Sequence, residues 1–286
     1  MKTLRIIFIS LGTLIILFLL GVFIFLKTFD VNRYLPQITQ KIAQSIDRKV
    51  SIAHGDLKFD WGKGVILELN QVSVGDVGLS SHNFMTTQKA DISIGSFISG
   101  KFTLTDIGIE LNILKTVLDK LSFIPGLSGM VQGSLSSQVS QRLNSDTTKL
   151  DKAWGKFILK DQNIILEDVY VESSLFEAEL SGLVGFDSTI QLDVKIHLAA
   201  DLSADLVKSV APLEGLLDEQ KRLLIPGKVS GKGAKIGFQP QIDYITKKIL
   251  NSQSAGQIGK QLEKVLEKNP KIKKIVSDVL DNILGQ

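Results

Sequence analysis

The 286-residue chain contains no cysteine, few histidines and no large excess of either charge. Without cysteine there is no disulfide, no thiolate metal ligand and no cysteine nucleophile. Its three histidines, His54, His82 and His197, lie too far apart in sequence for the spacing of a zinc site. The net charge of +3 is too small to predict a nucleic-acid-binding surface. We therefore expect no metal, no cofactor and no nucleic-acid partner.

Motifs for nucleotide binding and hydrolysis are also lacking. The glycine-rich stretch 231–237 has neither the dinucleotide-binding nor the P-loop spacing, and no serine lies in a nucleophile-elbow motif. We predict that the protein is not an enzyme. Hydrophobic residues make up 44% of the chain, which is enough for a folded core.

One long apolar run is present at the N-terminus. Residues Ile6 to Leu26 include no charged residue, and a helix of that length spans roughly 30 Å at about 1.5 Å per residue, the thickness of a bilayer's hydrocarbon core. Lys2 and Arg5 precede the run, so we expect the N-terminus in the cytoplasm. The alternative is a cleaved signal peptide, but the run is long and no small-residue cleavage site follows. We predict a single uncleaved transmembrane helix.

After this run the apolar period is first helical and then that of strands. Isoleucines four residues apart predict a helix over Asp30–Ile46. From Val50, short alternating runs bounded by turn residues predict antiparallel strands. A short helix is predicted at Ile113–Leu121, and strands resume at Lys156. The clearest run, Ile190–Leu198, has one apolar and one polar face, as in a sheet open to water on one side.

These patterns predict an α+β protein that is mainly antiparallel β. We expect a cytoplasmic tail at 1–5, the anchor at 6–26, a β-rich region at 27–131, a linker or loop rich in Ser and Gln at 132–148, a second β-rich region at 149–239 and amphipathic helices at 240–286.

The last segment carries the surplus positive charge, since eight lysines and five acidic residues follow Gln239. Basic amphipathic helices can dock on anionic lipid headgroups. They can also cap the end of a sheet with their lysines in water. Both interpretations stay open, and we favour the cap.

Three segments share apolar residues at positions i, i+3 and i+5: Leu69–Val74, Leu104–Ile109 and Leu166–Val171. In a straight strand, a shift of three moves a side chain to the opposite face. A bulge or tight turn at the intervening polar residues would keep all three on one face. So short a pattern also arises by chance, but three copies favour a repeated hairpin unit.

Several segments resemble the AsmA family of bacterial envelope proteins. They are the apolar run followed by Phe29–Pro36, the helix-to-strand segment Ile42–Ile52, the strand pair Trp61–Val74, and the strands Ala90–Ile94 and Gly100–Asn112. Asp47 stands where the family usually has glycine. The resemblance extends from Met1 to about Ile113. Residues 156–238 are similar in style to the family's C-terminal repeats.

The resemblance implies an inner-membrane protein of a two-membrane bacterium with its bulk in the periplasm. It also implies a long, curved and twisted sheet that forms an apolar groove for membrane lipids, phospholipid above all, and helps them move towards the outer membrane. We expect apolar strand positions to line this groove: Val65, Leu67, Leu69, Ile92, Ile94, Ile107, Ile109, Leu166, Val169, Val171, Leu192, Val194 and Ile196.

Two hypotheses for the function remain. In the first, the protein shields or transfers acyl chains, because the sequence has more strands with one apolar face than a single small core needs. In the second, the sheet is a closed core, and the surface recruits envelope protein partners in outer-membrane protein assembly or in a secretion apparatus.

Overall fold

The computed structural model describes residues 29–46, 48–60, 64–76, 82–96, 98–124, 127, 140, 144–232 and 235–250. The predicted anchor at 6–26 and the C-terminal stretch 251–286 lie outside these residues. Of the helices in the described ranges, none is both long enough and apolar enough to cross a membrane. The transmembrane helix and the topology therefore stay predictions.

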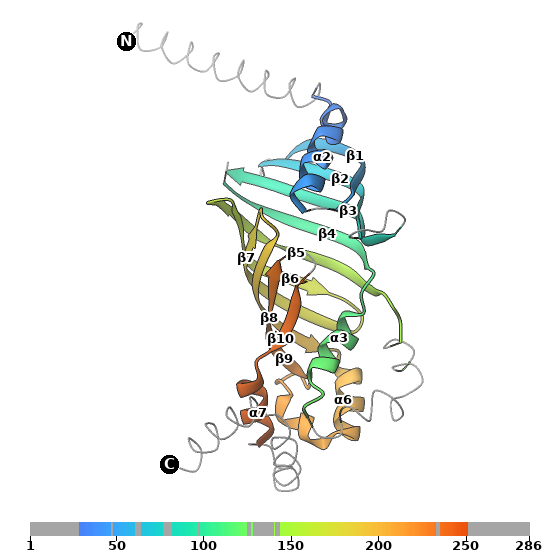
Figure 1. Cartoon of the computed structure of the whole chain (residues 1–286), viewed down its shortest axis with the longest axis vertical. Helices are drawn as coiled ribbons and strands as arrows, with labels where there is room; N and C mark the ends of the chain where they lie inside the picture. Colours follow the sequence, from blue (N-terminus) through green and yellow to red (C-terminus); the bar gives the residue numbers. More distant parts are fainter. Residues whose placement is uncertain are drawn as a thin grey trace, which may run out of the picture.

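Ten antiparallel strands form one curved and twisted sheet in which spatial order equals chain order (Figure 1). Every strand pairs with the next along the chain, so the β-rich stretches on either side of the linker predicted at 132–148 share one sheet. The prediction of a mainly antiparallel β-fold with flanking helices is confirmed. The strands are β1 (Val50–Asp60), β2 (Gly64–Gly75), β3 (Asn83–Ser96), β4 (Ser99–Ile109), β5 (Thr148–Lys160), β6 (Asn163–Glu172), β7 (Phe176–Gly185), β8 (Thr189–Leu198), β9 (Leu224–Lys232) and β10 (Gly237–Pro240).

Short helices flank both ends of the sheet. The segment predicted as one helix from Asp30 is a 3₁₀ turn followed by an α-helix, and the short helix predicted from Ile113 is confirmed, with Asn112 accepting a 2.7 Å hydrogen bond from the Lys115 amide as its N-cap. The helical elements are η1 (Val31–Arg33), α2 (Leu35–Ile46), α3 (Ile113–Lys120), α6 (Ala200–Ser209), η2 (Ala211–Leu216) and α7 (Ile242–Leu250).

The cross-strand register places one apolar face across the whole sheet. Directly opposed residues of antiparallel strands point to the same face. One such row runs through Gly55, Leu69, Ala90, Leu104 and Ala153 in strands β1 to β5. The row continues into β8 and β9 through further small and branched residues. The alternation in the sequence thus produces a single continuous apolar surface.

The repeated segments contain the predicted irregularity. Gln71, Asp106 and Asp168 adopt φ values of 51°, 53° and 48°, the left-handed region that is rare for residues other than glycine. Each lies directly before the second apolar residue of its repeat. At Asp168 the pairing with both neighbouring strands also shifts register. Leu104 and Ile107 consequently pack in the same core although they are three residues apart.

The start of β5 differs from the prediction. Alternation is visible from Lys156, but the strand begins at Thr148. Leu150 and Ala153 are both buried on the apolar face, three residues apart. Because these two apolar residues are three positions apart and not two, the start of the strand does not show alternation, and the predicted start was eight residues late.

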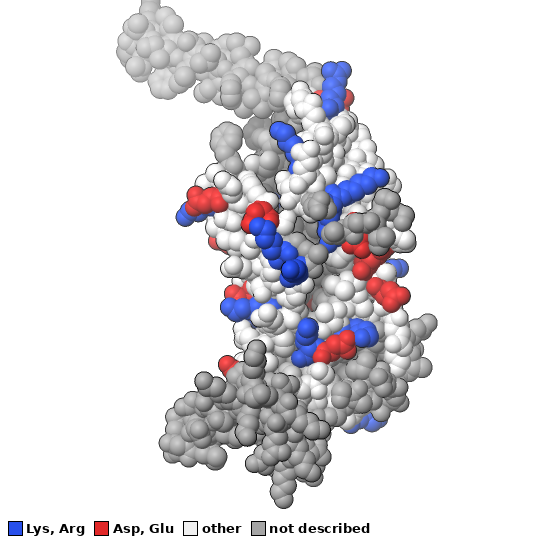
Figure 2. Space-filling model, viewed as in Figure 1, with Lys and Arg blue, Asp and Glu red and all other residues white. Residues whose placement is uncertain are grey.

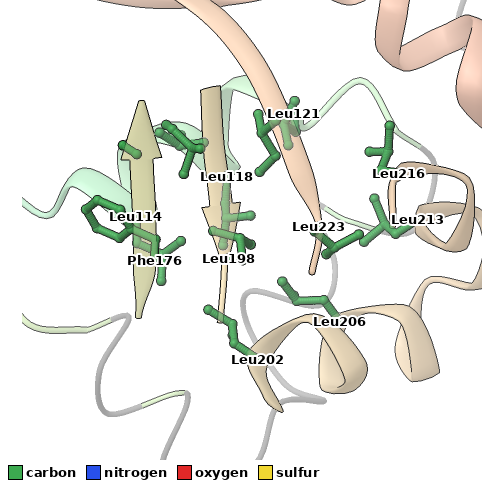
Figure 3. Packing of buried hydrophobic residues seen from close by; sticks show 14 of the residues in the cluster. Leu114, Leu118, Leu121, Phe176, Leu198, Leu202, Leu206, Leu213, Leu216 and Leu223 are labelled. Atoms are coloured by element: carbon green, nitrogen blue, oxygen red, sulfur yellow. The ribbon is translucent and has the colours of Figure 1, made fainter. Parts of the chain in front are cut away.

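Two separate cores cover parts of the apolar face. The larger one joins β4, β5 and β7–β10 to α3, α6, η2 and α7 (Figure 3). The smaller joins η1 and the start of α2 to β2 and β3 through Val31, Leu35, Leu69 and Ala90. The helices therefore close the apolar face at both ends of the molecule.

Candidate functional site

The two edges of the sheet differ in how their apolar face is covered. At the helix edge, where the connections carrying α3 and α6 join β4 to β5 and β8 to β9, the face is sealed. Leu198 of β8 is 0% exposed and Leu206 of α6 is 1% exposed, and both lie among leucines from several helices in Figure 3. This part of the face is an ordinary protein core.

At the hairpin edge, formed by the β1–β2, β3–β4, β5–β6 and β7–β8 turns, the same face stays partly exposed. Two rows of cross-strand partners run along it, one through β1–β8 and one through β5–β8. All their large side chains are half-buried or exposed. We call these residues the open strip: Phe59, Val65, Ile94, Phe157, Leu159, Ile164, Leu166, Val184, Ile190 and Leu192.

One close approach within the open strip shapes its surface. Gly100 is the partner of both Ile94 and Phe157. A Cβ at Gly100 would meet the Phe157 ring at 2.7 Å and the Ser93 carbonyl oxygen closer still. The Phe157 ring therefore occupies the space that a side chain at position 100 would need, and the row stays continuous there.

The structure divides the predicted groove residues among three environments. Val65, Ile94, Leu166 and Leu192 belong to the open strip, and Leu67 and Ile92 occupy the next, half-buried row. Leu69 belongs to the smaller core. A third group packs in or against the larger core, which Leu192 of the strip also contacts: Ile107, Ile109, Val171, Val194 and Ile196. Val169 is 5% exposed and lies against Gly155.

Sequence reasoning missed six members of the open strip, namely Phe59, Phe157, Leu159, Ile164, Val184 and Ile190. A signal was present, because Leu159, Ile164 and Ile190 are the last or first apolar residues next to a turn, and the other three lie two positions further from it in the same alternating runs. Strand ends beside the hairpin turns lie at the opposite edge of the sheet from the helices of the larger core. Proximity to the turns would therefore have been a better guide than alternation alone.

The opposite face of the sheet is polar and its charges are paired. Glu68 accepts hydrogen bonds from Lys58 at 2.8 Å and lies 2.9 Å from the Lys89 ammonium, and these lysines hold the pKa of Glu68 below its usual value. Trp154 and Tyr170 stack with their ring centroids 5.6 Å apart beside the Lys156–Asp168 pair. In Figure 2 charges of both signs lie close together over the visible surface. Because charges of both signs are interspersed, this face has no strong field of one sign that would attract a charged polymer such as a nucleic acid.

His197 takes part in an ion-pair network on this polar face. Its Nδ1 lies 2.9 Å from Asp218, which also accepts a 3.0 Å hydrogen bond from Arg222 Nε, while Arg222 reaches Glu177 at 2.6 Å. Burial acts to raise the pKa of Asp218, but hydrogen bonds from the Arg222 backbone, from His197 and from the Arg222 side chain outweigh it and lower the pKa. The network fixes the 218–222 turn to β7 and β8, which is a structural role.

The model of the AsmA family matches residues 1–112. This match confirms the resemblance inferred from the N-terminal motifs, and it covers the predicted anchor, η1, α2 and strands β1–β4. A search of curated proteins and a search of solved structures each gave no match.

Proposed function

We propose that this chain is a non-enzymatic, membrane-anchored envelope protein that shields or transfers the acyl chains of membrane lipids along the open strip. Its place would be the inner membrane, with the N-terminus in the cytoplasm and the sheet in the periplasm, serving outer-membrane biogenesis. The AsmA match over residues 1–112 supports the envelope role.

The observation that carries the proposal is the open strip itself. Soluble monomers seldom leave a long contiguous apolar surface in water. From β1 to β8 the strip crosses seven strand spacings, which at about 4.8 Å each extends roughly 34 Å. One leaflet's acyl chains span about half of a 30 Å hydrocarbon core, so the strip is long enough for an extended chain.

The energetics favour hydrocarbon as the ligand. Each methylene removed from water contributes about 0.8 kcal/mol, so an acyl chain laid on the strip recovers much of what it loses on leaving the bilayer. No chemical step is required of the protein. The predicted anchor would hold the strip close to the lipid, which raises the effective concentration of its ligand.

The test is lipid retention by the full-length chain, purified in mild detergent and analysed by mass spectrometry. We expect phospholipid to co-purify with the wild type and to be lost from the double variant Ile94→Asp/Leu192→Asp. The matched control is Ser181→Asp, an exposed position on the polar face of β7, which should retain lipid. A wild type without lipid, or strip variants that hold as much as the control, would refute the proposal. One stoichiometric protein partner without lipid would instead support the assembly role.

A further inference from the structure

Helix α2 is fixed against β1 and β2 near both of its ends. Before the helix, the Asn32 side-chain amide donates to the Gly55 carbonyl at 3.1 Å and accepts from the Gly55 amide at 2.9 Å, as a neighbouring strand would. Leu35 packs beside Gly55 and Leu69. After the helix, Arg48 donates to the Gly75 carbonyl at 3.3 Å. Together these contacts attach α2 to the β1–β2 wall of the sheet.

The apolar side of α2 is nevertheless only partly covered. Ile42 follows Leu35 by seven residues, which is two helical turns, so both lie on the same side of the helix about 10 Å apart. Leu35 is 6% exposed, whereas Ile42 is 40% and Ile38 is 41% exposed. The side of α2 that contacts the sheet at its first turn is thus only partly covered further along.

The β7–β8 turn is fixed to a different part of the sheet. Asp187 lies 2.7 Å from the Lys232 ammonium in β9 and accepts hydrogen bonds from the amide and hydroxyl of Thr189. Phe186 beside it is 52% exposed. The turn is therefore attached to β8 and β9, and the Phe186 amide also donates to the Gln162 carbonyl at 3.0 Å.

In the described part of the chain, one hydrogen bond joins helix α2 to the β7–β8 turn. The Ser188 hydroxyl donates a 3.2 Å hydrogen bond to the Ser45 carbonyl oxygen, between residues 143 positions apart in sequence. Within the described part of the chain, no other hydrogen bond or ion pair joins α2 to residues 185–189. An exposed neutral hydrogen bond contributes little net stability because water can replace both partners.

We propose that the seam between α2 and the β7–β8 turn is a lateral gate through which an acyl chain reaches the open strip. This inference rests on the lipid-binding function proposed above. Both elements carry exposed apolar side chains, Ile38 and Ile42 on α2 and Phe186 in the turn, and in the described residues one replaceable hydrogen bond joins them. Each side is fastened to its own strands, so opening the seam leaves the sheet intact.

The absence of native cysteine allows a direct test. In the double variant Ser45→Cys/Ser188→Cys, a disulfide would close the seam in the full-length chain. Ser188 Oγ lies 3.2 Å from the Ser45 carbonyl oxygen, so a small movement of either segment brings the pair within the Cα separation of about 4.4–6.8 Å that a disulfide requires. The measurement is transfer of fluorescent phosphatidylethanolamine from donor vesicles carrying the protein to acceptor vesicles, before and after reduction. We expect oxidation to reduce transfer to the protein-free level and reductant to restore it.

The matched control is Ser181→Cys/Asp193→Cys, which joins directly opposed partners within the same β7–β8 hairpin and leaves the seam free. Its transfer rate should not respond to oxidation. If the seam disulfide forms quantitatively and transfer continues, the gate is wrong while the lipid function stands. If neither oxidation nor a short bis-maleimide cross-linker joins the two cysteines, α2 and the β7–β8 turn are not in contact in solution, and the gate is also wrong. If the reduced form neither binds nor transfers lipid, the proposed function itself fails.

Discussion

The apolar face of this sheet carries the same kinds of side chain at the helix edge and at the hairpin edge, but helices cover it at the first edge and leave it partly exposed at the second. At the helix edge α3, α6, η2 and α7 seal the face into a core. At the hairpin edge the same strands continue with side chains of the same type, which no described helix seals. The comparison separates two consequences of one sequence pattern: alternation produces the apolar face, and the long connections decide which part of it stays dry.

The largest expected effect comes from comparing the two ends of β8. Leu198 is 0% exposed at the helix edge, and Ile190 is half-buried in the open strip. Leu198→Ala should lower the free energy of unfolding by about 2–5 kcal/mol, because a fully buried side chain leaves a cavity. Ile190→Ala should cost no more than about half of that, since much of its surface already lies in water. Urea denaturation of both variants measures the difference. Equal losses would mean that the open strip is covered in solution.

A smaller effect is expected at the left-handed residues that turn the repeats. Asp106 has φ of 53° in β4, directly before the buried Ile107. Asp106→Val should destabilise the protein by roughly 1–2 kcal/mol, because a β-branched residue is strained in this conformation. Asp106→Gly is the control and should be close to neutral, since glycine adopts positive φ freely. Similar denaturation midpoints for the two variants would show that β4 does not depend on this conformation.

Much of the fold could be predicted because it follows from local pattern. Alternation marked most strands, and the spacing of the repeats predicted irregular positions that the structure places at Gln71, Asp106 and Asp168. The early start of β5 was hidden because a period of three precedes Lys156.

The accessible part of the apolar face could not be predicted from alternation, for a physical reason. Ile107 and Ile94 have the same alternating context, but one lies beneath α3 and its neighbours and the other is 46% exposed. Alternation predicts that one face of a strand is apolar, but it does not identify the element that packs on that face. The covering helices α3 and α6 come from connections whose packing depends on the curvature of the whole sheet, and this curvature is not encoded in any one strand.

The smallest expected effect concerns acid sensitivity at the hairpin edge. The Lys232 ammonium, together with hydrogen bonds from Thr189, lowers the pKa of Asp187 from 3.8 to about 2. A depressed pKa means that this carboxylate stabilises the β7–β8 turn above pH 3.8 and that the stabilisation is lost as the pH falls towards 2. In Lys232→Met the pKa of Asp187 should rise towards 3.8, so the turn should lose this acid dependence. Carboxyl carbon NMR titration measures the pKa directly.

The control is Lys228→Met, which removes another lysine of β9, the partner of Asp193, and should leave the pKa of Asp187 unchanged. An unchanged Asp187 in Lys232→Met would mean that the turn is not attached to β9, and then β8 and β9 could not hold the turn in place while the seam opens.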